Sequence, residues 1–281
     1  MYKIGIIGNG FVGSAIAAGF GLHADVYVYD ADSKKSINTF EEIMECEFIF
    51  VAVPTPMNLS DNNKIDLSIV RDVFTRISEH PKHSNSICIV KSTVVPGTTR
   101  MLSSEYPNLQ IVFNPEFLTE RSARLDFINT SRIVIGGDPA PCERLADLYR
   151  VRFPHTPIVV SDSVSAEFIK YMCNCFFSTK VSFMNEMKQA VTALDLDWNG
   201  IMKGFLLDGR IGNSHVEVPG HDGHLGFGGK CFPKDLNAFI NFFKESGVSP
   251  TVMTAAWEKN IEVRNVADWE KIKGATSNKE E

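Results

Sequence analysis

Residues 3–13, KIGIIGNGFVG, decide the fold of this 281-residue chain. An apolar strand runs directly into a GxGxxG sequence, formed by Gly8, Gly10 and Gly13, which then opens a helix. The first glycine permits a tight turn, the second lets the backbone approach a pyrophosphate, and the third lets the helix pack closely on the strand. Asp30 closes the next apolar run and can bind a pair of ribose hydroxyls. The combination predicts a dinucleotide site.

The charges beside this site favour one form of the dinucleotide. A carboxylate at Asp30 binds the free ribose hydroxyls of NAD and repels the 2′-phosphate of NADP. Lys34 and Lys35 weaken this preference, because nearby cations can accommodate the phosphate. We therefore expect NAD as the cofactor.

Short apolar runs alternate with helical patterns through the first half of the chain. The predicted strands are 3–8, 26–30, 48–53, 87–92, 110–114, 132–137 and 158–162, and the helical patterns between them include 11–20, 66–78 and 142–151. Strands this apolar, separated by helices, indicate a parallel sheet covered on both faces. We expect an α/β fold that begins with a doubly wound Rossmann domain over residues 1–160.

The hydrophobic period changes after this domain. Residues 163–194 contain neither proline nor glycine and predict a helix of roughly 30 residues, about 45 Å long. Apolar residues spread broadly around this helix, so neighbouring helices, a second subunit or both must cover it. Shorter helices are expected near 197–207, 233–246 and 250–266. The sequence thus predicts a long central helix that opens an all-α domain over 161–266, followed by a polar tail over 267–281.

Composition and charge exclude several classes of protein. A hydrophobic fraction of 44% with 20 Phe excludes a disordered chain. No apolar run approaches the roughly 20 residues that cross a bilayer, and the first residues already form a strand. With a net charge of −6 and no basic clusters, the sequence has no positively charged segment that would bind nucleic acid or anionic membranes. These features indicate a soluble cytoplasmic protein.

Cys231 lies in surroundings unlike those of the other five cysteines. None of the six forms a CxxC pair, which favours a reducing compartment. Cys231 belongs to GFGGKCFPKD, residues 226–235, where Pro233 predicts the first position of a helix. A helix N-terminus and the neighbouring Lys230 and Lys234 lower the pKa of a thiol and favour the nucleophilic thiolate. From the residues alone, a reactive cysteine and a structural glycine loop both remain open.

Other polar residues are equally ambiguous when taken singly. Lys170 and Asn174 share one face of the long helix, which is typical of a solvated stripe. Glu116, Glu120 and Thr93 follow predicted strands, where ligand sites form but loop carboxylates and capping hydroxyls are also common.

Three histidines precede the glycine loop and, with Cys231, offer the ligand types of a zinc site. Their spacing to Cys231 matches no compact zinc pattern, so no metal is expected. The three are His215, His221 and His224.

Taken together, the sequence resembles the UDP-glucose/GDP-mannose dehydrogenase family, the NAD-dependent four-electron nucleotide-sugar dehydrogenases. The resemblance covers residues 1 to about 245, in the family's order. Its segments are GxGxxG with Asp30, VAVPTP, KSTVVPGTT, NPEFLTE, AEFIKYMCNCFFSTKVSFMNE, DGRIGN and GFGGKCFPKD.

This resemblance implies catalytic roles for six residues. Asn174 and Lys170 would orient the sugar 6-hydroxyl, and Lys170 or a water near Asp235 would take its proton. Cys231 would form a thiohemiacetal and then a thioester. Glu116 would activate the hydrolytic water, and Thr93 would help to hold it.

The resemblance also implies binding residues and partners. Cofactor contacts would come from Gly8, Gly10, Phe11, Val12, Gly13, Asp30, Lys35, Pro54, Thr55, Thr93, Glu120 and Lys234. Contacts to a UDP-sugar would come from Glu116, Phe117, Leu118, Glu120, Lys170, Asn174, Arg210, Phe227, Gly228 and Gly229. Family members dimerise through the central helical domain, and Arg210 would reach the substrate of the neighbouring subunit. Their uronate products commonly feed polysaccharide biosynthesis.

The chain departs from the family in length and in two cations. Family members usually continue into a third, nucleotide-binding domain, so this is expected to be a short form, either natural or truncated. Arg121 and Lys230 replace small residues and could grip the diphosphate. A single-step hydroxyacid-type NAD dehydrogenase and a nucleotide-sugar-binding subunit that needs a partner remain as alternatives.

Overall fold

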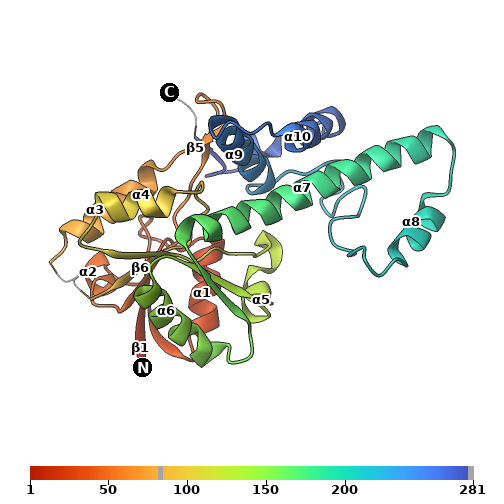
Figure 1. The fold of residues 1–281 in the computed structure, drawn as a ribbon. Helices are drawn as coiled ribbons and strands as arrows, with labels where there is room; N and C mark the ends of the chain where they lie inside the picture. Colours follow the sequence, from red (N-terminus) through yellow and green to blue (C-terminus); the bar gives the residue numbers. More distant parts are fainter. Residues whose placement is uncertain (82–84, 278–281) are drawn as a thin grey trace. The chain divides into compact units, whose positions relative to one another are not determined.

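The computed structural model describes residues 1–81 and 85–277, which fall into two compact units (Figure 1). Unit 1 comprises Met1–Thr55 and Asp66–Lys170, and unit 2 comprises Pro56–Ile65 and the described residues from Tyr171 onward. The boundary thus lies inside the long helix, ten residues beyond the expected position. Residues 56–65, expected in the first domain, belong to unit 2.

Unit 1 contains a seven-stranded sheet in the order β2-β1-β3-β6-β7-β8-β9. Its strands are β1 (Tyr2–Ile7), β2 (Ala24–Tyr29), β3 (Phe48–Val51), β6 (Ile87–Val90), β7 (Gln110–Phe113), β8 (Ile133–Gly136) and β9 (Ile158–Ser161). Each coincides with a predicted apolar run. Because β2 and β3 lie on opposite sides of β1, the order reverses there, which is where doubly wound sheets bind ligands.

The expectation of a wholly parallel sheet is wrong for the last two strands. β8 pairs antiparallel with β7 through Phe113 and Gly136, and β9 then pairs parallel with β8. An antiparallel neighbour begins near the end of the preceding strand, so the connection need not travel back along the sheet. The short α5 (Ala123–Ile128), which follows the 3₁₀ helix η1 (Glu120–Ser122), therefore suffices as a connector.

Helices cover both faces of this sheet. One apolar cluster joins it to α1 (Phe11–Phe20), α5 and α6 (Pro139–Arg152), and Phe20 packs there against Phe50, Phe127, Tyr149 and Phe153. The other cluster joins the sheet to α2 (Phe40–Ile43), α3 (Ser68–Glu79), α4 (Thr98–Glu105) and the first turns of α7. The doubly wound Rossmann architecture is confirmed.

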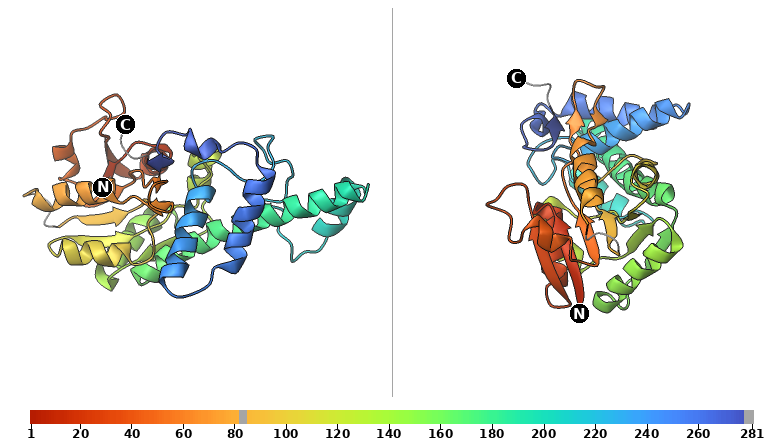
Figure 2. Two further views of the ribbon diagram at one scale, coloured as in Figure 1. Left: turned by 90° about the horizontal axis from the view of Figure 1, so that it is seen from above. Right: turned by 90° about the vertical axis from the view of Figure 1, so that its left-hand side faces the viewer.

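Helix α7 (Ser163–Ala193) runs unbroken for 31 residues (Figure 2). It matches the helix predicted from the absence of proline and glycine over 163–194. Its first eight residues belong to unit 1 and the remainder to unit 2. The helical region expected to follow the Rossmann domain is confirmed as α8 (Trp198–Leu206), α9 (Phe232–Glu245) and α10 (Thr251–Val263).

The expected polar tail is partly folded onto unit 2. After α10 the chain forms the 3₁₀ helix η2 (Asp268–Glu270), whose Trp269 is buried and packs against Trp257. β10 (Thr276–Ser277) then pairs with β4 (Met57–Asn58), which forms a hairpin with β5 (Lys64–Ile65). Burial of a large aromatic ring and backbone pairing explain the departure from a solvated tail over 267–277. The rest of that prediction, residues 278–281, lies outside the described residues.

Replacing the buried ring tests whether this segment is part of the folded unit. Trp269→Ala is expected to lower the free energy of unfolding by about 3 kcal/mol, because it removes a large apolar side chain and leaves a cavity. Leu22→Ala, at a side chain that is 91% exposed, is the matched control and should change it by less than about 0.5 kcal/mol. Urea denaturation measures both, and an unchanged midpoint for Trp269→Ala would contradict the packing.

Candidate active site

The turn between β1 and α1 is built for the close approach of backbone to ligand. Gly8 has φ +101°, and a Cβ there would lie 2.5 Å from the carbonyl oxygen of Ala52. A Cβ on Gly13 would collide with the Gly8 carbonyl, so the helix can pack on the turn only without a side chain. In contrast, no described atom lies within 4 Å of the position that a Cβ on Gly10 would take. The space in front of the helix is therefore open.

This open space has the polarity that a dinucleotide requires. No described side chain caps the first turn of α1, which leaves backbone N–H groups and the positive end of the helix dipole for an anion. The Asp30 carboxylate accepts hydrogen bonds from the backbone N–H groups of Asn9 at 2.7 Å and Asp32 at 2.8 Å. Each oxygen keeps a lone pair for a hydroxyl. Asn9 also binds the carbonyl of Lys35, which ties that residue's backbone to the turn. The residues present fit NAD.

The loops after β3 and β6 are joined at the same edge of the sheet. The Thr55 hydroxyl donates to the carbonyl of Thr93 at 2.8 Å, and the Ser92 hydroxyl donates to the carbonyl of Val53 at 2.7 Å. Pro54 lies between these contacts and is exposed. The predicted cofactor residues Pro54, Thr55 and Thr93 thus belong to one loop pair beside the nucleotide turn.

A buried ion pair stands behind the NPE segment that follows β7. The Lys170 ammonium donates to Oε1 of Glu116 at 2.8 Å, and the backbone N–H of Leu118 donates to Oε2 at 2.7 Å. Both side chains of the pair are at most 5% exposed. The Lys170 ammonium also lies 5.6 Å from the ring centroid of Phe117. Because both carboxylate oxygens are engaged, the orientation of Glu116 is fixed.

Lys91 is a buried cation that the sequence interpretation missed. Its ammonium donates to Oδ1 of Asn114 at 2.8 Å and to the carbonyl of Pro115 at 3.0 Å. Burial lowers the pKa of Lys91 to about 7; the nearby Glu116 opposes this shift and Lys170 adds to it. The only sequence signal is that the lysine directly follows the apolar run ICIV.

A second missed residue, Glu167, holds the KSTVVPGTT segment. Its carboxylate accepts hydrogen bonds from the backbone N–H groups of Gly97 at 2.6 Å and Thr99 at 2.7 Å, at the start of α4. Burial raises the pKa of Glu167 to about 7, against the lowering effect of these hydrogen bonds. One turn before Lys170 on α7, it fixes the loop that continues from Thr93.

Unit 2 contains a buried polar group at the start of α9. The Asn174 amide donates to Oδ2 of Asp235 at 2.5 Å, and the Lys234 ammonium donates to Oδ1 at 2.5 Å. All three side chains are buried or nearly so. This geometry joins three residues that the sequence analysis had connected only through the family resemblance.

Cys231 directly precedes this group. It stands immediately before α9, which begins at Phe232, so Pro233 is the second helical residue rather than the first. The backbone N–H of Asp235 closes the first turn on the Cys231 carbonyl at 2.8 Å. Of the six cysteines, Cys231 and Cys173 are partly exposed and the other four are buried. Burial raises the pKa of Cys46 and Cys88 to about 12, which makes those two inert at neutral pH.

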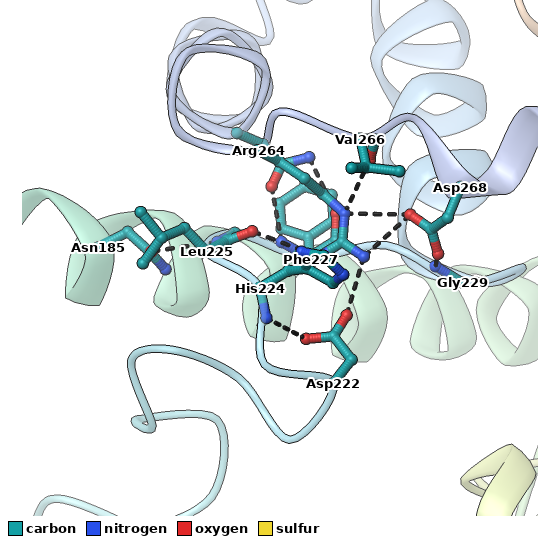
Figure 3. A network of polar contacts seen from close by, with 11 residues as sticks. Asn185, Asp222, His224, Leu225, Phe227, Gly229, Arg264, Val266 and Asp268 are labelled. Carbon is teal, nitrogen blue, oxygen red and sulfur yellow. Dashed lines mark hydrogen bonds and ion pairs between the residues drawn. The ribbon is translucent and has the colours of Figure 1, made fainter.

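Side chains from three elements hold the glycine loop before Cys231 (Figure 3). Oδ1 of Asn185 accepts from the Gly226 N–H at 3.0 Å. The Asn260 side chain both accepts from the N–H of Phe227 and donates to its carbonyl, at 2.7 and 3.0 Å. Oδ2 of Asp268 accepts from the Gly229 N–H at 2.9 Å. The Phe227 ring is itself buried, so the loop is packed as well as bonded.

The remaining predicted site residues lie in more open positions. Arg210 is exposed and pairs with Asp208 at 2.6 Å. Glu120 and Arg121, in η1, line an open pocket with Phe11 and Ser14 from the first turns of α1.

The segment 213–225 is anchored within unit 2. Val216 and Val218 are buried with Met184, and Asp222 pairs with Arg264.

Among residues 1–81 and 85–277, His, Cys, Asp and Glu side chains nowhere gather in threes as a metal ion would require. Over the same residues, every helix is too short or too polar to serve as a membrane span.

Lys91 gives a pH-dependent prediction. Its pKa is about 7 in the folded protein against an ordinary value of 10.5, so between these values the unfolded chain binds a proton that the folded protein does not. Its contribution to the free energy of unfolding therefore rises with pH over this interval. Lys91→Met removes that contribution, so the stability difference, wild type minus variant, should grow with pH. Urea denaturation across the interval measures it, with the exposed Lys244→Met as control. A difference independent of pH would contradict the shifted pKa.

Comparison with known proteins places this geometry in a family. Residues 33–152 match the NAD-binding domain, and residues 164–262 the central domain, of the UDP-glucose/GDP-mannose dehydrogenase family. The UDP-glucose 6-dehydrogenase AglM of Haloferax volcanii is 30% identical, over 92% of this chain and 69% of its own length. The UDP-glucose 6-dehydrogenase of Rickettsia bellii is 34% identical, over 79% of this chain and 51% of its own length.

A solved structure agrees with these matches. The UDP-glucose dehydrogenase of Pyrobaculum islandicum superposes with a TM-score of 0.80 at 29% identity, over 93% of this chain and 68% of that one. The chain therefore spans between about half and two thirds of the length of these relatives. Its Rossmann sheet, its long helix and its two matched domains make it a member of the UDP-glucose/GDP-mannose dehydrogenase family.

Proposed function

We propose that this protein is an NAD-dependent nucleotide-sugar 6-dehydrogenase that oxidises UDP-glucose, or a related UDP-sugar, to the uronate. The observation that carries the proposal is Cys231, a partly exposed thiol at the start of α9. Lys234 and Asp235 lie in the first turn of the same helix. Asp235 accepts hydrogen bonds from Lys234 and from Asn174 of α7. Family membership supports the reaction class, because the named relatives are UDP-glucose 6-dehydrogenases.

The first oxidation requires a proton acceptor at the sugar 6-hydroxyl. Asn174 and Lys170 orient this hydroxyl, and Lys170 or a water near Asp235 takes its proton. When bound at the Gly8–Gly13 turn, NAD⁺ supplies the hydride acceptor for each of the two oxidations. Asp235 keeps the Asn174 amide in place through the 2.5 Å hydrogen bond.

The second oxidation proceeds on the cysteine. The Cys231 thiolate adds to the aldehyde carbon, and protonation of the oxygen gives a thiohemiacetal. Oxidation of this adduct gives a thioester. The N-terminus of α9 favours the thiolate. The covalent bond also keeps the reactive aldehyde from escaping between the two oxidations.

Hydrolysis completes the reaction. Glu116 takes a proton from the attacking water, Thr93 helps to hold that water, and the C–S bond breaks to return the Cys231 thiolate. The Lys170 ammonium stabilises the oxyanion that forms on the substrate. The balance is one alcohol, two NAD⁺ and one water giving one carboxylic acid, two NADH and two protons.

The yield of NADH per mole of limiting UDP-glucose tests this proposal. The wild type should give two NADH by absorbance, and Cys231→Ser should give at most one, because the first oxidation does not need the sulfur but the thiohemiacetal and thioester of the second cannot form. Cys173→Ser, at the other partly exposed cysteine, is the matched control and should still give two. A yield of one that is indifferent to Cys231 would support a single-step dehydrogenase instead.

We propose in addition that the protein forms a homodimer through α7. Met172, Phe176 and Phe183 recur at helical spacing and are 62%, 65% and 51% exposed, so they form one apolar stripe. Isolated exposed apolar residues are ordinary, but an aligned stripe marks an interaction surface. A second copy of the same helix presents the complementary apolar surface.

Charge introduced into the stripe tests the dimer. Phe176→Glu combined with Phe183→Glu is expected to convert a dimer into a monomer in sedimentation velocity, because two buried, unpaired carboxylates would oppose association. Leu22→Glu, on the exposed surface of unit 1, should leave the dimer intact. A wild-type monomer, or a dimer that survives both charges, would rule this interface out.

A further inference from the structure

Behind the glycine loop lies a charge cluster in which a buried guanidinium pairs with two partly exposed carboxylates (Figure 3). The Arg264 side chain is 1% exposed and pairs with two carboxylates, Asp222 at 2.8 Å and Asp268 at 2.9 Å. Its guanidinium also donates to the carbonyls of Leu225 and Val266. A buried guanidinium is tolerated only when such partners replace its hydration.

One of these carboxylates bonds directly to the loop that carries Cys231. Oδ1 of Asp268 binds Arg264 and Oδ2 accepts from the Gly229 N–H, two residues before the thiol. Both oxygens are thus used, one to fix the carboxylate and one to fix the loop. Gly229 has φ +74°, in the left-handed region that favours glycine.

The neighbouring glycine shows how closely the cluster and the loop are fitted. A Cβ on Gly228 would collide with the guanidinium of Arg264 and the carboxylate of Asp268. The charge cluster therefore requires the absence of a side chain at this position. The loop and the cluster form one packed unit.

We propose that Arg264 and Asp268 are positioning residues for Cys231. Arg264 orients the Asp268 carboxylate, and Asp268 fixes the backbone at Gly229. The loop thereby fixes the position of the Cys231 sulfur at the start of α9. The inference rests on the proposed function for its link to turnover. Both residues lie just beyond 164–262, the part of the chain that matches the central domain, so the family match assigns them no role.

Loss of the anchor should lower the rate of chemistry without weakening binding. Displacing a reacting group by about 1 Å can reduce a rate about 100-fold. For Asp268→Ala we expect kcat to fall about 10- to 100-fold, with the KM values for UDP-glucose and NAD⁺ changed less than about twofold. Asp268→Asn keeps an oxygen for the Gly229 N–H but turns an amide N–H2 toward Arg264, so it should recover only part of the lost rate.

Alkylation of the thiol tests the inference without substrate. Iodoacetamide labelling of Cys231, followed by peptide mass spectrometry, should be about tenfold slower in Asp268→Ala and within about threefold of wild type in Asp268→Asn. Asp208→Ala breaks an exposed ion pair with Arg210 and is the matched control, with labelling as in wild type. Labelling proceeds even if the chain never produces NADH, so failure of this inference and failure of the proposed function are distinguishable.

Thermal melting separates positioning from folding. A folded Asp268→Ala protein that labels Cys231 at the wild-type rate would overturn the inference. If that variant does not fold, Arg264→Lys decides: it keeps a positive charge for Asp222 but loses the planar fork that orients Asp268. About tenfold slower labelling would support the anchor, and an unchanged rate would overturn it.

Discussion

The buried polar side chains of α7 hold the segments to which we assign the chemistry. A buried polar group without a partner destabilises the fold by about 1–3 kcal/mol, so each of these side chains fixes the segment to which it bonds. All four of these side chains lie on one unbroken helix, so the absence of proline and glycine over 163–194 matters for the site and not only for the fold. The partners are Gly97 and Thr99 for Glu167, Glu116 for Lys170, Asp235 for Asn174 and Gly226 for Asn185.

Elements with a strong local pattern could be predicted, and elements set by distant contacts could not. Apolar periodicity predicts strands and long helices, as β1 and α7 illustrate. The reversal of β8 has no such signal, because strand direction depends on the neighbour with which a strand pairs. The same holds for β10, two residues whose pairing with β4 joins positions more than 200 apart in sequence, and for Trp269, a single aromatic residue in a polar stretch.

The site divides along the same line. Cys231 could be singled out from its glycine-rich context before a helix, whereas Lys170 and Asn174 gained a predicted role only through the family resemblance. The sequence did not single out Lys91, Glu167 or the Arg264–Asp268 pair, because a charged residue is expected to be solvated unless its partner is known. Those partners lie 23 to 70 residues away, and in each case burial together with a hydrogen bond turns an ordinary charge into an anchor. Sequence thus points to the proposed reacting groups more readily than to the groups that we propose orient them.

The central claim is that Cys231 carries the substrate covalently between the two oxidations, and trapping that adduct tests it most directly. Glu116→Gln removes the base for hydrolysis while keeping a side chain of similar shape beside Lys170. Incubated with UDP-glucose and NAD⁺, this variant should gain the mass of one UDP-glucuronyl group on the peptide that contains Cys231. An unmodified Cys231 in a variant that still reduces NAD⁺ would contradict covalent catalysis.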